Sequence, residues 1–336
     1  MAKMLIAGDE TLSLRSQAGD YGTLCEAFQA AVAARGDARA LVDSESGEQW
    51  SWAEAGRDVH RIAGGLAGLA VSKGDTVALA LRNRPEFNLV DAAAFHLGAV
   101  PWSVYLTSAP EQIHSLLAQA HSKVVIAEAD LLPRLREAAA GTDVEHIIDV
   151  EHLDALPNPP GGFDFDTQWR DVEPETPLTI IWTSGTTGHP KPVELTHRSM
   201  LHLLDAITHV TGVQPGGRML SYLPSAHVAD RWSAHGWWMT LGAELTCVRD
   251  IANLMATTAQ VHPTIWGSVP RAAGVGEVAR CLGGSGHCGT GTSSRRGQAC
   301  GSLQARAGPG RDPHCGCGTS RSRNVALLRE FGPADL

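Results

Sequence analysis

The segment 183–191 contains the residues of this chain that are most directly suited to chemistry. It reads Thr-Ser-Gly-Thr-Thr-Gly-His-Pro-Lys and follows an apolar run at 178–182. Its two glycines leave backbone N–H groups uncovered, its four hydroxyls add hydrogen-bond donors, and Lys191 adds a positive charge. Loops of this kind bind phosphate oxygens. The segment therefore predicts a cradle for the β- and γ-phosphates of a nucleotide.

The spacing within this loop distinguishes it from a Walker A loop. The distance in sequence from glycine to lysine differs, and Pro192 follows the lysine where a Walker A loop has the Ser or Thr that binds magnesium. A Ser/Thr/Gly-rich surface turn is the alternative interpretation. The specific residues at 181–191, placed between two predicted strands, favour the phosphate loop.

The elements that must position the loop alternate between helices and strands. We predict helices over residues 24–32, 51–69, 85–96, 109–120, 131–140, 199–211, 231–241 and 251–261. We predict strands over residues 40–42, 49–52, 76–81, 99–104, 123–127, 145–149, 178–182, 193–195, 218–223, 245–248 and 263–269. Ser51 and Glu54 indicate a capping box, and the proline-rich stretch 156–177 indicates a surface connection. The alternation predicts an α/β fold with βαβ units around largely parallel sheets.

Composition and charge restrict the classes of function. The 336 residues are enough for about two domains, and the net charge of −9 argues against a general nucleic-acid-binding protein. The sequence shows neither a signal peptide nor a run of ~18 apolar residues that would span a bilayer. We therefore expect a cytoplasmic protein with no integral membrane segment and no nucleic-acid partner, and peripheral contact with a membrane stays open.

Several segments resemble the adenylate-forming (acyl-activating) enzyme superfamily, which includes acyl-CoA synthetases, peptide-synthetase adenylation domains and luciferases. Residues 181–191 are similar to the phosphate loop of that superfamily, and residues 221–231 resemble the segment that follows the loop in long-chain fatty acyl-CoA ligases. Weaker similarity to the family lies at residues 97–101, 111–113, 123–126, 262–264 and 269–271. The resemblance covers about residues 21–271 and corresponds to the N-terminal half of a ligase.

The resemblance implies an ATP-dependent ligation in two steps. A fatty-acid carboxylate attacks the α-phosphate of MgATP to give acyl-adenylate and pyrophosphate, and the thiol of coenzyme A then displaces AMP. ATP, Mg²⁺ and coenzyme A are the implied cofactors. His227 corresponds to a residue that lines the acyl side of the site, although a lone histidine is more often a packed, hydrogen-bonded residue. The residues that correspond to the pyrophosphate-holding loop are Thr183, Ser184, Gly185, Thr186, Thr187, Gly188 and Lys191.

The resemblance ends after Arg271. The family's adenine-stacking segment and its C-terminal catalytic lysine find no match, and no lysine follows Lys191, so no catalytic residue is identified. Large apolar residues are scarce between Cys281 and Arg323, too scarce to offset the chain entropy of folding. We therefore expect a disordered tail, or one produced by a frameshift or split gene, and a complementing C-terminal fragment as a partner.

The sequence thus divides into three parts. These are an N-terminal extension (1–20), a partial AMP-binding (adenylate-forming) large domain (21–271) and a divergent tail (272–336). The tail holds a cluster with no CxxC pair, whose spacing is a weak signal for zinc, so we assign no metal site. The cluster consists of Cys281, His287, Cys288, Cys300, His314, Cys315 and Cys317.

Two alternatives to an active fatty acid–CoA ligase follow from the same residues. One is a catalytically incomplete remnant of such a ligase, because the matched motifs hold only part of a site. The other is a ligase for a different carboxylic acid. A related choice concerns Trp232, Trp237 and Trp238, which fit either the core of their helix or the wall of an acyl tunnel, and helical spacing favours the core.

Overall fold

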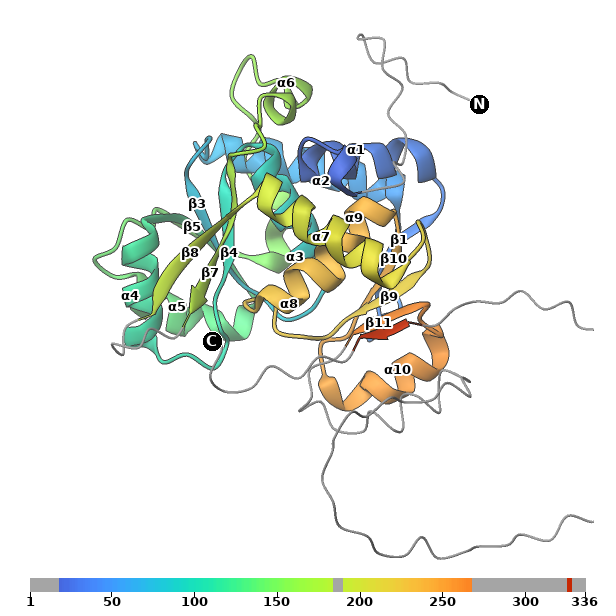
Figure 1. Cartoon of the computed structure of the whole chain (residues 1–336). Coiled ribbons are helices and arrows are strands. Elements are labelled where there is room, and N and C mark those ends of the chain that lie inside the picture. Colours follow the sequence, from blue (N-terminus) through green and yellow to red (C-terminus); the bar gives the residue numbers. More distant parts are fainter. Residues whose placement is uncertain (1–17, 184–189, 268–324, 328–336) are drawn as a thin grey trace, which may run out of the picture.

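The computed structural model describes residues 18–183, 190–267 and 325–327. Figure 1 shows two main sheets side by side, with helices packed between them and over their outer sides. The prediction of a mixed α/β fold with largely parallel sheets is confirmed. Most of the predicted extension and of the predicted tail lies outside the described residues, so disorder or a frameshift there stays a prediction.

The six-stranded sheet carries the predicted phosphate loop. Its strands, in spatial order, are β6 (His146–Asp149), β5 (Ser122–Ala127), β3 (Thr76–Ala80), β4 (Val100–Ser103), β7 (Pro177–Thr183) and β8 (Lys191–Thr196). Neighbouring strands are parallel except for β7 and β8, which form an antiparallel hairpin. The carboxyl ends of β3, β4 and β7 therefore meet at one edge of the sheet.

The four-stranded sheet supplies the second half of the framework. Its strands, in spatial order, are β2 (Gln49–Ser51), β1 (Arg39–Asp43), β10 (Glu244–Cys247) and β9 (Arg218–Ser221). β1, β10 and β9 are parallel, and β1 and β2, which match the strands predicted over 40–42 and 49–52, form an antiparallel hairpin. β11 (Ile265–Gly267) follows a backbone contact to β9 at Thr264 and pairs in parallel with β12 (Val325–Leu327), the described part of the tail.

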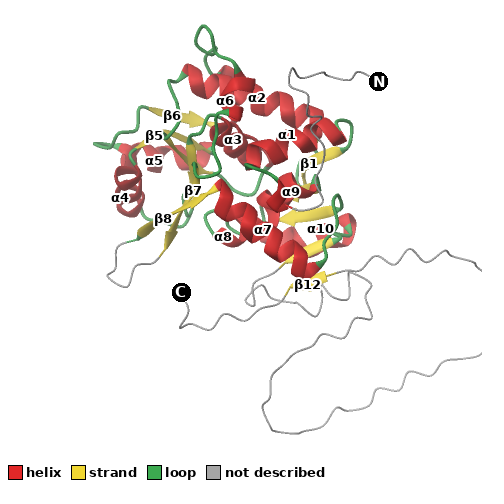
Figure 2. Cartoon of the chain, turned by 45° about the horizontal axis from the view of Figure 1, so that its top comes forward, coloured by secondary structure: helices red, strands yellow, loops and turns green. Residues whose placement is uncertain are grey.

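Helices cover both faces of the six-stranded sheet, as parallel strands require. The α-helices of the described residues are α1 (Leu24–Arg35), α2 (Trp52–Gly68), α3 (Pro85–His96), α4 (Pro110–Ala120), α5 (Leu132–Ala139), α6 (Phe165–Arg170), α7 (His197–Thr211), α8 (Val228–Asp230), α9 (Trp237–Leu241) and α10 (Leu254–Val261). Figure 2 shows α4 and α5 on the outer face, away from α1, α2 and α3. Among the described residues, none of these helices is long and apolar enough to cross a membrane.

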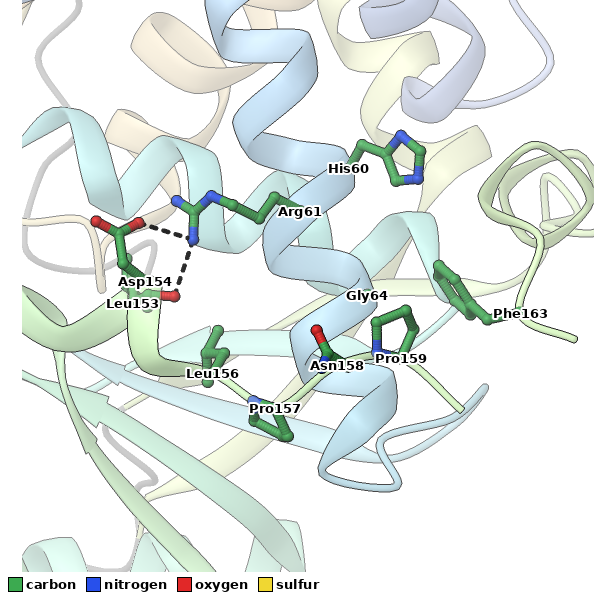
Figure 3. A pocket seen from close by; sticks show the side chains of 10 residues that line it. All are labelled: His60, Arg61, Gly64, Leu153, Asp154, Leu156, Pro157, Asn158, Pro159 and Phe163. Atoms are coloured by element: carbon green, nitrogen blue, oxygen red, sulfur yellow. Dashed lines mark hydrogen bonds and ion pairs between the residues drawn. The ribbon is translucent and has the colours of Figure 1, made fainter. Parts of the chain in front are cut away.

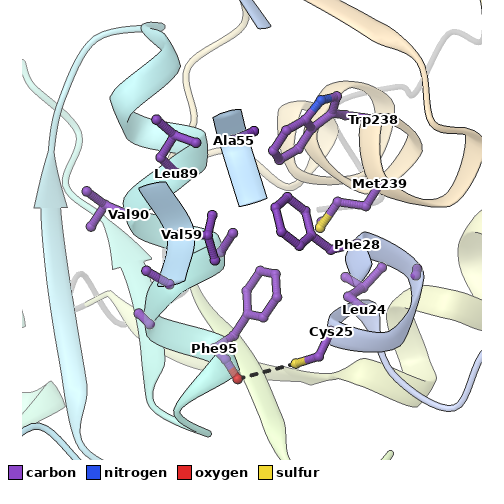
Figure 4. Packing of buried hydrophobic residues seen from close by; sticks show 14 of the residues in the cluster. Leu24, Cys25, Phe28, Ala55, Val59, Leu89, Val90, Phe95, Trp238 and Met239 are labelled. Atoms are coloured by element: carbon purple, nitrogen blue, oxygen red, sulfur yellow. Dashed lines mark hydrogen bonds between the residues drawn. The ribbon is translucent and has the colours of Figure 1, made fainter. Parts of the chain in front are cut away.

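The larger core joins α1, α2, α3, α7 and α9 to the facing sides of both sheets. Alternation along β3 explains the layering, because Val77 and Leu79 point into this core while Ala78 and Ala80 face the smaller core under α4 and α5. Figure 4 shows Phe28 beside Trp238 in the larger core. Trp238 also stacks on Trp52, with ring centroids 5.0 Å apart.

Helix α2 begins as the sequence predicts. The Ser51 hydroxyl accepts a hydrogen bond from the backbone N–H of Glu54 at 3.2 Å, and the Glu54 carboxylate accepts one from the backbone N–H of Ser51 at 2.8 Å. This reciprocal pair satisfies two N–H groups that the helix leaves free. It fixes the start of a helix that lines the core.

Glycines of α2 allow residues 156–159 to lie directly against the helix backbone. A Cβ atom at Gly65 would lie 2.5 Å from Cβ of Leu156, and one at Gly68 would lie 2.5 Å from the backbone oxygen of Asn158. A Cβ atom at Gly64 would instead have ordinary contacts, the shortest at 3.5 Å. The connection that leads toward β7 is therefore held tightly at two of these glycines.

The structure departs from two of the main predictions. Helix α6 lies within residues 156–177, which the sequence predicts to be an irregular connection. The prolines of this stretch all lie outside 165–170, so a short helix can form there, and it buries Phe165 and Trp169. The single helix predicted over 231–241 consists of a π-helical turn at Arg231–Gly236 followed by α9. Other predicted helices and strands are present, with shifts at their ends.

Candidate active site

The predicted phosphate loop closes a hairpin at the carboxyl end of β7. Thr183 pairs with Lys191 across the two strands, and the Thr183 hydroxyl donates a hydrogen bond to the backbone oxygen of Lys191 at 3.3 Å. The two ends of the loop are therefore side by side. The loop residues predicted to hold phosphate, Ser184, Gly185, Thr186, Thr187 and Gly188, lie outside the described residues.

The base of the hairpin is buried while its end is exposed. Ile181 and Trp182 are 8% and 7% exposed, and Trp182 packs its ring edge against Trp102 of β4 with centroids 5.5 Å apart. Thr183 and Lys191, one step further along the strands, are exposed. A rigid sheet thus presents the start and the end of the loop to solvent.

Lys191 is the cation that this edge offers to an anion. Its ammonium group makes no hydrogen bond or ion pair with any residue that the structure describes. A free ammonium beside a loop opening fits the phosphates of a nucleotide, because it gains a partner on binding and loses none. The described part of the loop is therefore compatible with the predicted phosphate site.

His227 lies in the segment that connects β9 to α8. The ring is exposed, and its Nδ1 accepts a hydrogen bond from the backbone N–H of Ala229 at 3.0 Å, which caps α8. Because Nδ1 accepts, the neutral ring carries its proton on Nε2. The ring therefore presents an N–H donor to solvent.

Buried polar contacts connect the His227 segment to the six-stranded sheet. Asn83 follows β3, and its amide donates to the Ser221 hydroxyl and to the Leu223 backbone oxygen, both at 2.8 Å. The Ser221 hydroxyl in turn donates to the Asp230 carboxylate at 3.2 Å. Desolvation on burial raises the pKa of Asp230 to about 7, against the lowering by that hydrogen bond. These contacts bring the carboxyl ends of β3 and β9 together.

A second set of contacts centres on Arg231. Its guanidinium forms a buried ion pair with Asp91 of α3 and donates to the hydroxyl of Ser103, the last residue of β4, at 3.1 Å. Asp91 also contacts the His235 ring, with Oδ2 and Nε2 2.8 Å apart, and Nδ1 of His235 lies 2.8 Å from the Asn88 amide oxygen. Burial alone would raise the pKa of Asp91, but the charges of Arg231 and His235 bring it below its ordinary value.

These contacts place the two predicted site segments at the same edge. β4 lies beside β7, with Trp102 opposite Ile180, so Ser103 is close in register to the strand end that carries Thr183. Ligands of open α/β sheets bind outside the carboxyl ends of the strands. The described base of the hairpin, with Thr183 and Lys191, and the His227 segment therefore lie at one edge and form one candidate site.

Sequence reasoning identified His227 but missed the residues that hold its segment. Asn83, Asp91, Ser103 and His235 carry no motif signal. One signal was available, because Asp91 lies in a helix whose other residues are almost all buried and mostly apolar. A carboxylate in such a helix requires a partner.

The tryptophans of the 231–241 region are core residues. Trp237 and Trp238 are 2% and 0% exposed. Trp232 is partly buried and packs its ring edge against Trp237, with centroids 5.3 Å apart. Their burial supports the core interpretation over a tunnel wall.

A cavity of about 270 Å³ lies apart from this edge, between α2 and residues 153–163 (Figure 3). Its cation, Arg61, is already engaged, since it donates to the backbone oxygen of Leu153 at 2.9 Å and pairs with Asp154 at 3.0 Å. The cavity therefore offers no free cation comparable to Lys191. Within the described ranges, no cluster of three or more His, Cys, Asp or Glu side chains could hold a metal ion; the cysteine cluster predicted in the tail lies outside them.

Comparison with known proteins agrees with this arrangement. A family model described as AMP-binding enzyme matches residues 28–275. A Mycobacterium tuberculosis protein named as fatty-acid–CoA ligase fadD11 is 47% identical over 109 residues, which are 32% of this chain and 19% of that protein. The long-chain-fatty-acid–CoA ligase FadD15 of the same organism is 32% identical over 237 residues, which are 65% of this chain and 38% of that protein.

The fold also matches a solved structure. The inhibitor-bound N-terminal domain of FACL13 from Mycobacterium tuberculosis aligns with a TM-score of 0.65 and 25% identity, over 75% of this chain and 64% of that one. The matched region is 19% of fadD11 and 38% of FadD15, so this chain spans well under half the length of either ligase. Residues 28–275 include the hairpin, the His227 segment and both main sheets, and the chain belongs to the family of AMP-binding enzymes.

Proposed function

We propose that this chain binds ATP and a fatty acid as part of an AMP-forming fatty acid–CoA ligase. The observation that carries the proposal is the β7–β8 hairpin, which holds Lys191, whose ammonium has no partner among the described residues, beside the opening of a hydroxyl- and glycine-rich loop. The loop residues assigned to the phosphates are Thr183, Ser184, Gly185, Thr186, Thr187, Gly188 and Lys191. Membership of an AMP-binding family supports a nucleotide as the ligand.

The proposed reaction has two steps. A carboxylate oxygen of the acid forms a bond to the α-phosphorus of ATP while the bond to pyrophosphate breaks, which leaves an acyl-adenylate. The thiol sulfur of coenzyme A then bonds to the acyl carbon and AMP leaves with the electron pair. In the first step, Lys191 and the loop N–H groups stabilise the charge that develops on pyrophosphate. Mg²⁺ enters this scheme bound to ATP.

His227 is proposed to contact the acyl side of the substrate. Its Nε2–H is fixed as a donor by the contact between Nδ1 and Ala229. A donor in this position would hold an oxygen of the acid or of the acyl-adenylate. The ring is unsuited to take up a proton at Nδ1 without losing that contact, so it orients substrate instead of acting as a base.

The relatives support a fatty acid as the substrate. FadD15 is named as a long-chain-fatty-acid ligase and fadD11 as a fatty-acid ligase, and both align with this chain. We assign residues 21–271 to the partial large domain and 1–20 and 272–336 to its flanking segments. A fragment equivalent to the rest of such ligases is the proposed partner, and the proposed location is cytoplasmic, with peripheral contact to a membrane as the open alternative.

The test is fatty-acid-dependent exchange of labelled pyrophosphate into ATP, with the chain alone and with a C-terminal ligase fragment added. We expect exchange that requires both the acid and Lys191. Binding of ATP without exchange under both conditions would instead identify the chain as a remnant that retains the nucleotide site. Exchange with an aryl acid but not with a fatty acid would reassign the substrate class.

A further inference from the structure

The His227 segment is held by residues from the opposite sheet at both of its ends. Before His227, Asn83 binds the Ser221 hydroxyl and the Leu223 backbone oxygen. After it, Arg231 binds Asp91 and Ser103. Asn83 and Ser103 both lie at the carboxyl edge of the six-stranded sheet, whereas the segment itself extends from β9 of the four-stranded sheet.

The contacts around Arg231 are buried, so breaking them would leave charged groups without partners and away from water. Arg231 and Asp91 are 2% and 1% exposed at their side chains, and His235 is 4% exposed. The Arg231 guanidinium also lies over the Phe87 ring, 5.3 Å from its centroid. Buried charges without partners are strongly destabilising. The chain therefore has little freedom to move Arg231 away from Asp91 and Ser103.

The backbone conformation of the segment serves the same contacts. Arg231 and His235 both belong to the π-helical turn Arg231–Gly236, and both reach the single carboxylate of Asp91. π-Helical turns are rare and occur frequently at functional sites. Here the turn brings the Arg231 guanidinium and the His235 ring to one carboxylate, directly after the short helix that His227 caps.

We propose that Asn83 and Arg231 are positioning residues that fix the His227 ring against the acyl substrate. The proposal rests on the function proposed above. Neither residue needs to touch the substrate: Asn83 fixes the backbone before His227, and Arg231 fixes α8 after it. Together they keep the Ala229 N–H directed at Nδ1 of His227, so that Nε2–H stays the donor.

The experiment uses two variants of the full chain, Arg231→Met and Asn83→Ala. Asn83→Ala removes no charge, so it tests the proposal even if the Arg231→Met variant does not fold. Folding is checked by thermal unfolding. The spectroscopic readout is the ¹⁵N NMR shift of the His227 ring nitrogens at alkaline pH. The binding readouts are the Kd of 5′-O-(N-palmitoylsulfamoyl)adenosine and the Kd of ATP.

We expect the wild-type ring to be the Nε2–H tautomer and the folded variants to show a mixture of tautomers. Affinity for the palmitoyl analogue should fall about tenfold, which corresponds to ~1.4 kcal/mol, while ATP affinity changes by less than about twofold. Ser122→Ala is the matched control. It removes the buried acceptor of the Trp102 indole N–H at the start of β5, away from the site edge, and should lower stability without changing either readout.

An unchanged His227 tautomer in both folded variants overturns the inference, and so does an equal loss of affinity for the palmitoyl analogue and ATP. A wild-type chain that binds neither probe contradicts the proposed function instead. In that case the NMR readout still decides whether Asn83 and Arg231 position His227.

Discussion

The two halves of the candidate site are built on opposite principles. At the β7–β8 hairpin, Lys191 is exposed and its ammonium group makes no hydrogen bond or ion pair with other described residues, so its charge is available to a ligand. Around His227, the supporting groups are buried and contact one another, and Asp91 alone contacts both Arg231 and His235. The comparison teaches that the proposed phosphate side depends on available charge, whereas the proposed acyl side depends on fixed geometry.

The largest expected effect is that of Lys191→Ala. Loss of a charged group that stabilises a leaving group typically costs about 10²–10³-fold in rate, so we expect pyrophosphate exchange to fall by that amount. The unfolding midpoint should not move, because the side chain has no partner in the described structure. Lys73→Ala is the control, since the Lys73 ammonium is an exposed cation away from the site that donates to the backbone oxygen of Asp171. A large drop in stability for Lys191→Ala would break the comparison.

The next largest effect is the pH dependence of the unfolding free energy that Asp230 causes. Burial raises the pKa of Asp230 to about 7 in the folded chain, far above an ordinary aspartate. In the unfolded chain the group loses its proton first, so its contribution to stability is complete at low pH and is lost as the pH rises from about 4 to about 7.

Asp230→Asn removes that titration. The difference in unfolding free energy between variant and wild type should therefore shift in favour of the variant as pH increases, by at most ~1.4 kcal/mol per pH unit. Chemical denaturation at a series of pH values measures it. A difference that stays constant from pH 5 to pH 7 would show that Asp230 is already ionised in the folded state.

A smaller effect is expected for Thr183→Val at the base of the hairpin. The change removes the hydroxyl that donates to the backbone oxygen of Lys191. An exposed neutral hydrogen bond contributes about 0.5–1.5 kcal/mol, and water replaces it on the open side. We expect ATP affinity to weaken severalfold at most with thermal stability almost unchanged, as measured by calorimetric titration and thermal unfolding.

The smallest expected effect is the response to salt, which should differ between the Lys191 region and the His227 region. Raising ionic strength screens exposed charges but acts weakly on buried pairs. ATP affinity should therefore fall by about threefold or less between low and moderate salt in a Lys191-dependent way. The tautomer of the His227 ring should not respond. A salt-dependent tautomer would mean that the supporting network is open to solvent.

Local signals in the sequence were sufficient for much of the fold. The Ser51–Glu54 capping box and the apolar strand predicted over residues 76–81 each depend on a few neighbouring residues, and both are present. Helix α6 was not predicted, because prolines flank this short segment and favour an irregular connection. Its stability comes from burying Phe165 and Trp169.

The site was predictable only where the chemistry lies within one segment. Lys191 was proposed from the local pattern of its loop, and His227 from the resemblance of residues 221–231 to a family segment. The partners of Arg231 could not be found in this way, because Asp91 and Ser103 precede it by more than a hundred residues and only the packing of two sheets brings them together.

The close approach of residues 156–159 to α2 has a consequence for engineering the chain. Surface connections normally tolerate insertion, tagging and circular permutation. Here Leu156 and Asn158 lie against Gly65 and Gly68 with no room for a single methyl group. New termini opened in this connection would detach residues 156–159 from α2 and so loosen the chain that leads to β7 and its hairpin. The turn between β1 and β2, where a Cβ atom at Gly47 would meet nothing within 4 Å, is the better place to cut.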